Sequence, residues 1–263
     1  MMVRVCEMTF LLASSLAVLP AFAGPALDVL VESYPDHLVS HDDNSITWRD
    51  GTVMPVGDEA KGLNFEELLK GPSILSQFAI PYPLGSGLKV PQLNEDPGRI
   101  RYEPFFTKMY GDCRKGDVEK RLKPVAWLPR YGGGTLMATS VNSVADRLSE
   151  VSRELEMLPK AMMKYLIPSA GIYNCRAITE TDRTSVHSYG AAIDINDRYS
   201  DYWVWTKKKK GQFTWVNRIP LEIVHIFEQH GFIWGGKWYH FDTMHFEYRP
   251  EMIRLAERGW PRD

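Results

Sequence analysis

The stretch SVHSYGAAIDIN, Ser185–Asn196, decides how the rest of the chain is interpreted. Its second half predicts a short strand, in which Ile193 and Ile195 face one side and Asp194 faces the other, because side chains alternate along a strand. A carboxylate in such a strand is costly to bury unless it is paired or bound to a metal. His187 lies seven residues before Asp194. A bend between the two would bring imidazole and carboxylate to one point.

A second stretch offers partners for this pair. An imidazole and a carboxylate that converge favour zinc, which in catalytic sites takes three protein ligands and keeps an open position for water. The sequence WYHFDTMHFEY, residues 238–248, holds His240, Asp242 and His245 within six positions. Packing in the core is the alternative for His245, which has apolar neighbours. Asp242 could accept a proton from water beside a metal, provided that a bulge or turn brings it to the same side.

The composition is that of an ordinary globular protein. The chain has 263 residues, of which 44% are hydrophobic and 24% charged, and its formal net charge is −2. This size suits one large domain or two small ones. The charge balance argues against a nucleic-acid partner, which would require a basic face. The dense basic run Lys207–Lys210 is interpreted as a solvated loop tip, with binding of an anionic polymer as the alternative.

The N-terminus predicts export. Arg4 precedes an apolar run, Met8–Leu19, which is followed by small residues at Ala21 and Ala23. This order is typical of a secretory signal peptide, expected to span residues 1–23. The run is shorter than the ~20 residues that cross a bilayer. We therefore expect a secreted or periplasmic protein without a transmembrane anchor after cleavage of the signal.

Export changes the interpretation of the cysteines. Beyond the signal the chain contains Cys113 and Cys175. In an oxidising compartment such a pair is most simply a disulfide. The alternative is that Cys175 serves as a metal ligand or nucleophile.

The chain divides by composition near residue 110. Residues 24–110 are rich in Pro and Gly, with one short helix expected at Phe65–Lys70 and turns or extended pieces elsewhere. Their many aromatic residues predict a wrapping segment packed on a core, because disordered chains are poor in such residues. Residues 111–263 are the expected catalytic domain.

This second part predicts an α+β fold, because its helices and strands do not alternate in a long series. We expect a small antiparallel sheet that carries the metal site and is flanked by helices. The helices are expected at residues 142–158 and 219–231. The strands are expected within residues 125–129, 132–140, 171–178, 191–196, 232–236 and 244–248.

Both motifs carry a family resemblance. SVHSYGAAID is similar to the S-x-H-x-x-G-x-A-x-D signature of the zinc D-alanyl-D-alanine peptidase family, which includes carboxypeptidases, dipeptidases and L-alanyl-D-glutamate endopeptidases. DTMHFEY resembles the second motif of that family. The resemblance implies one zinc ion per chain, held by His187, Asp194 and His245. It also implies Asp242 as the catalytic acid and base, where many relatives have glutamate.

The same resemblance implies an arginine before the first motif that binds the substrate carbonyl or stabilises the oxyanion. Arg176 matches this position, and Arg183 is the nearer alternative. A disulfide at Cys175 would anchor Arg176. Ser185 is a candidate for support of the ligands. His240 is a candidate for the same role, or for replacing one of the ligands.

The function expected from these features is hydrolysis of peptidoglycan stem peptides by an exported zinc metallopeptidase. The bond that is cut stays open between D-Ala-D-Ala and L-Ala-D-Glu, as does endopeptidase versus carboxypeptidase action. A serine penicillin-binding peptidase is disfavoured, because the chain lacks the K-T-G motif. The alternative from another class is a metal-containing cell-wall binding module of the same fold. The sequence leaves the oligomeric state open.

Overall fold

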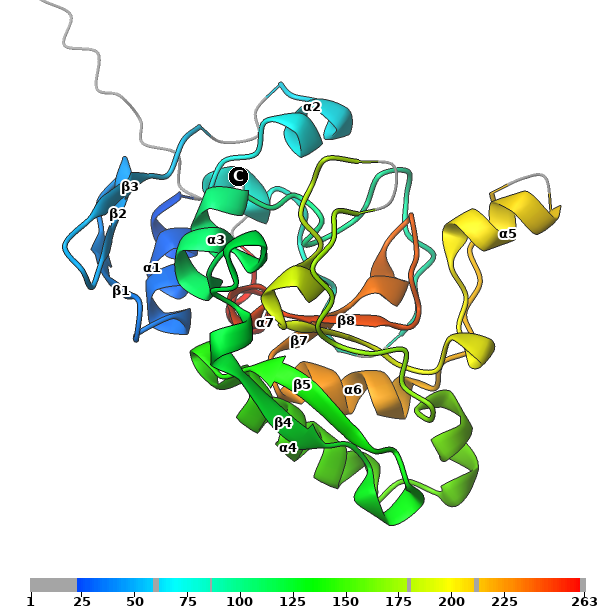
Figure 1. Cartoon of the computed structure of the whole chain (residues 1–263). Coiled ribbons are helices and arrows are strands. Elements are labelled where there is room, and N and C mark those ends of the chain that lie inside the picture. Colours follow the sequence, from blue (N-terminus) through cyan, green and yellow to red (C-terminus); the bar gives the residue numbers. More distant parts are fainter. Residues whose placement is uncertain (1–22, 59–61, 86, 179–180, 211–212, 261–263) are drawn as a thin grey trace, which may run out of the picture.

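The computed structural model describes residues 23–58, 62–85, 87–178, 181–210 and 213–260. The expected signal peptide, residues 1–23, lies outside these residues except for its last position. Three small antiparallel sheets are surrounded by helices (Figure 1), which confirms the α+β prediction. Within the described part of the chain, no helix has the length and apolar character needed to cross a membrane.

The central sheet carries both sequence motifs. Its strands, in spatial order, are β6 (Ala192–Asp194), β8 (His245–Tyr248) and β7 (Phe232–Trp234). All neighbours are antiparallel, and the register of β6 and β8 sets Asp194 directly opposite His245. Two residues that are far apart in sequence therefore lie side by side on neighbouring strands.

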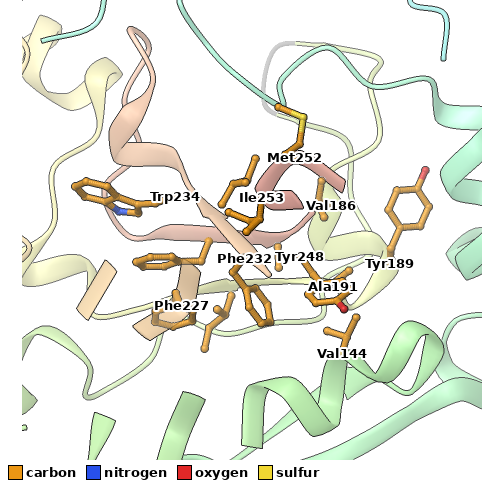
Figure 2. Close-up of a cluster of buried hydrophobic side chains, with 14 of the residues drawn as sticks. Val144, Val186, Tyr189, Ala191, Phe227, Phe232, Trp234, Tyr248, Met252 and Ile253 are labelled. Carbon is orange, nitrogen blue, oxygen red and sulfur yellow. The ribbon is translucent and has the colours of Figure 1, made fainter. Parts of the chain in front are cut away.

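The apolar face of this sheet packs on helices. Phe246 of β8 stacks on Phe227 of α6 (Leu221–Gln229), with ring centroids 3.9 Å apart. Figure 2 shows Phe227 and Trp234 within this buried cluster. Since side chains alternate along a strand, burial of Phe246 on this side directs its neighbours in β8 toward the opposite face.

A strand pair and a helix lie beside α6, toward the lower left in Figure 1. The antiparallel pair β4 (Leu122–Ala126) and β5 (Thr135–Thr139) packs against α4 (Val144–Leu155), which in turn contacts α6. Helix α4 is shorter than the expected range 142–158. Asn142 and Ser143 have positive φ of 53° and 59°, and this left-handed backbone prevents a helix from starting before Val144.

The N-terminal wrapping segment is more regular than expected. The short helix α2 (Phe65–Lys70) is confirmed, and Asn64 caps it in a capping box with Glu67. Three strands were missed because strands of three or four residues show little periodicity: β1 (Leu38–His41), β2 (Ser45–Trp48) and β3 (Val53–Pro55). The helices α1 (Ala23–Ser33) and α3 (Glu103–Tyr110) were missed as well.

Helix α1 joins this segment to the end of the chain. It packs against α7 (Pro250–Arg258), and the buried hydroxyl of Tyr34 donates a 2.6 Å hydrogen bond to Glu251. The aromatic residues of the segment also belong to the main core, for example Phe78 and Phe105, both fully buried. The segment therefore completes the core rather than trailing from it.

Two local predictions were wrong. Residues 171–178 do not form a strand and make only isolated bridges, at Gly171 and Ala177. The basic run Lys207–Lys210 is not a loop tip, because it ends helix α5 (Trp203–Lys210). In the first case a covalent link is present beside the isolated bridges.

This link is the disulfide between Cys113 and Cys175, which is confirmed with Cα atoms 5.8 Å apart. It excludes Cys175 as a metal ligand or a free nucleophile. The bond ties residues 171–178 to the end of α3 by way of the short turn Cys113–Lys115.

Candidate metal centre

Three side chains from both motifs meet at one point. His187 lies in the 3₁₀ turn Val186–Tyr189, Asp194 ends β6, and His245 begins β8. The bend expected between the first two is made by Gly190, whose φ is 66°. A Cβ atom at Gly190 would lie 2.9 Å from Leu122 and 3.1 Å from a backbone nitrogen. Only glycine fits this bend without strain.

The donor atoms have the spacing of a metal site. The distances are 3.2 Å from His187 Nε2 to Asp194 Oδ2, 3.0 Å from His245 Nδ1 to Asp194 Oδ1, and 3.2 Å between the two histidine nitrogens. A tetrahedral zinc ion with bonds of about 2.0–2.1 Å keeps its ligand atoms roughly 3.3 Å apart. The three residues therefore fit zinc, and they form a group whose ligand atoms all lie within 4.8 Å of one another.

Hydrogen bonds behind the histidines turn the correct nitrogens inward. His187 Nδ1 lies 2.6 Å from the carbonyl of Ile172 and donates to it, so Nε2 presents a lone pair to the site. His245 Nε2 lies 3.3 Å from Glu247 and donates to that carboxylate, so Nδ1 faces inward. Such outer contacts fix the tautomer and the ring orientation of metal ligands.

The electrostatics concentrate charge at this point. Burial alone would raise the pKa of Asp194, but His187 and the hydrogen bonds from both histidines hold it well below its usual range. Burial alone would lower the pKa of His245, but its hydrogen bonds to Asp194 and Glu247 raise it to about 10. The site therefore favours an ionised carboxylate and a positive charge beside it.

Asp242 lines the same cavity as this group but does not belong to it. A turn, closed by a hydrogen bond from the His245 nitrogen to the Asp242 carbonyl at 3.2 Å, supplies the reversal that the sequence required. Burial, and then the charge of Asp194, raise the pKa of Asp242 to about 6. Its buried Oδ1 has no hydrogen-bond partner among the described residues. A carboxylate oxygen is thus left available to exchange a proton.

The triad and Asp242 lie on the wall of a cavity of about 230 Å³. Arg176 and Ser185 also line it, and Arg176 is exposed to solvent. Arg183 is not among the lining residues, and its guanidinium instead donates to the Arg99 carbonyl at 2.6 Å. Burial, and next the charge of Arg101, lower the pKa of Arg183 to about 9.

His240 contacts the wrapping segment. Its Nδ1 lies 2.6 Å from Asp96, and its ring stacks on Phe65 with centroids 6.2 Å apart. It therefore ties the wrapping segment to the second motif, and it does not lie in the group that His187, Asp194 and His245 form.

The structure adds residues that the sequence reasoning missed. Glu247 is fully buried and faces the cavity, two positions after His245 on the same side of β8. Arg101 of the wrapping segment holds it at 3.4 Å, and Arg249 holds its other oxygen at 3.3 Å. The i, i+2 spacing of His245 and Glu247 on a strand was a readable signal for the acid. Nothing local pointed to Arg101.

The hydrogen bond between His245 and Glu247 predicts that Glu247→Gln weakens zinc binding by about 10- to 100-fold. This is the usual loss when the hydrogen-bond partner of a metal ligand is removed. The amide can turn its own donor toward His245 and then no longer fixes the required tautomer. Competitive chelator titration of the purified protein measures the dissociation constant. Glu222→Gln is the matched control, because Glu222 is exposed on α6. Equal zinc affinity in both variants would contradict the role of Glu247.

The fold and the ligand group together support a metallopeptidase. Comparison with protein families agrees, since residues 179–248 match the family model described as D-alanyl-D-alanine carboxypeptidase. This segment contains both motifs and confirms the resemblance stated from them. Searches of curated proteins and of solved structures found no match.

Proposed function

We propose that the protein is an exported zinc metallopeptidase that hydrolyses peptide bonds in peptidoglycan stem peptides. The observation that carries the proposal is the meeting of His187, Asp194 and His245 at metal-ligand spacing, with the buried acid Asp242 beside them. The family match over both motifs supports the peptide substrate class. The apolar N-terminal run and the disulfide support export.

His187, Asp194 and His245 would hold one zinc ion per chain. Zinc, when bound, supplies Lewis-acid polarisation of the scissile carbonyl and acidifies the attacking water. Two neutral imidazoles and one carboxylate are a donor set typical of this metal. Outer hydrogen bonds to Ile172 and Glu247 keep these imidazoles in place.

Asp242 exchanges the protons of the reaction. Its carboxylate takes one proton from water as the water oxygen bonds to the carbonyl carbon, and it delivers that proton to the nitrogen as the carbon–nitrogen bond breaks. Arg176 lines the same cavity and stabilises the negative charge that develops on the carbonyl oxygen. Ser185, buried at the cavity wall before the turn that carries His187, helps to hold that turn.

The test is to incubate the purified protein with defined muropeptides and to identify the products by mass spectrometry, with metal content measured on the same sample. We expect one zinc per chain, cleavage of a stem-peptide bond, and loss of cleavage on chelation that added zinc restores. A protein that binds zinc and leaves every muropeptide intact would instead be a cell-wall binding module.

A further inference from the structure

The wrapping segment sends one loop, Asp96–Arg101, to the wall of the metal cavity. Backbone oxygens of the loop accept hydrogen bonds from the segment between and after the motifs. Trp238 Nε1 donates to the Pro97 carbonyl at 2.7 Å, and Arg249 donates to the Gly98 carbonyl at 2.9 Å. The backbone of the loop is thus fixed at two neighbouring residues.

The two arginines of this loop have different surroundings. Arg101 is buried, and its guanidinium is committed to Glu247. Arg99 has side-chain exposure of 21%, and its nearest carboxylate, Asp96, is 3.8 Å away, beyond hydrogen-bonding distance. Asp96 is already engaged by the ring and the backbone nitrogen of His240, at 2.6 and 2.9 Å. Among the described residues, the Arg99 guanidinium therefore makes no hydrogen bond, and its donors remain available.

Arg99 is also close to the reacting groups. Its guanidinium lies over the Trp238 ring at 4.9 Å from the centroid, and that ring is 5.6 Å from the ring of His245. Both Arg99 and Trp238 line the cavity that contains the metal ligands. The acid Asp242 lines the same cavity.

We propose that Arg99 binds the free terminal carboxylate of the peptide and makes the enzyme a carboxypeptidase rather than an endopeptidase. This assignment rests on the proposed function. A planar guanidinium with unused donors matches a carboxylate in two parallel hydrogen bonds, and its position over the Trp238 ring places it at the cavity wall.

The experiment compares two substrates that differ only at the terminus. They are a tripeptide ending in D-Ala-D-Ala with a free carboxylate, and the same peptide as its C-terminal amide. Steady-state kinetics give kcat and KM for each, and zinc content is measured for every protein. The variants are Arg99→Ala, Arg99→Lys and, as matched control, Arg114→Ala, whose side chain is 74% exposed.

We expect wild-type protein to prefer the free acid, and Arg99→Ala to reduce this preference by about 10- to 100-fold through KM for the acid. Arg99→Lys keeps the charge without the planar fork and should fall between the two. Arg114→Ala should retain the wild-type preference. Unchanged zinc content in both Arg99 variants would show that the metal centre is intact.

Two kinds of failure are distinguishable. If wild-type protein cuts acid and amide equally well, or if Arg99→Ala lowers both activities by the same factor, Arg99 does not read the carboxylate and the assignment is overturned. The peptidase function would survive that result. If zinc-loaded wild-type protein cuts neither these peptides nor any muropeptide, the proposed function fails and the role of Arg99 fails with it.

Discussion

Replacing Asp242 with asparagine is expected to lower kcat for stem-peptide cleavage by about 10²- to 10⁴-fold, the range for loss of a general acid or base. Asparagine keeps the volume of the side chain but cannot take up a proton. Zinc content should remain at one per chain, because Asp242 is not part of the ligand group. Stopped assays with product detection by mass spectrometry, together with metal analysis, measure both quantities.

Asp197→Asn is the control, since Asp197 is an exposed aspartate on the same domain. A fully active Asp242→Asn protein would mean that another group carries the proton. Loss of zinc in this variant would instead assign Asp242 to the ligands. Asp242→Glu adds a methylene and should retain part of the activity, because it keeps an ionisable carboxylate at this position.

The largest expected effect on stability comes from the disulfide. Replacement of both Cys113 and Cys175 with serine opens a loop with a sequence separation of 62, which the chain-entropy model values at about 4 kcal/mol. For a domain of this size, such a loss lowers Tm by roughly 10 °C. Calorimetry of the double variant, beside wild-type protein with and without reductant, measures the shift.

Reduced wild-type protein should melt with the double variant, which would separate loss of the bond from any effect of the serine hydroxyls. An unchanged Tm in the double variant would mean that packing around α3 and residues 171–178 holds without the cross-link. Activity is a second readout, because Cys175 adjoins Arg176. Without the disulfide, residues 171–178 lose their anchor, and we expect kcat to fall by a larger factor than the zinc content.

The meeting of His187, Asp194 and His245 could be predicted from the sequence because each motif is local. SVHSYGAAID fixes the spacing of His187 and Asp194 across a bend that needs glycine, and β8 begins at the histidine of the second motif. The disulfide followed from the expected export and the cysteine count. These inferences need only neighbours in sequence or the chemistry of a residue type.

The remaining parts of the site depend on contacts between distant residues. Arg101 and Glu247 are 146 positions apart, and no periodicity links them. Arg99 lies in the stretch NEDPGRIR, which reads only as a turn. The strand expected at 171–178 failed for a related reason, since that stretch is held by a disulfide to Cys113 and by isolated bridges rather than by a continuous ladder.

The loop Asp96–Arg101 has a consequence for how the chain can be divided. A fragment beginning at residue 111 would keep every ligand and both motifs, yet it would strip the cover from Trp238. Glu247 would lose one of its two guanidinium partners, Arg101, deep in the interior. The motif-bearing portion is therefore not a portable module. Transferred alone into another scaffold, it should still contain the three candidate ligand residues, but their side chains should not be held in a fixed geometry.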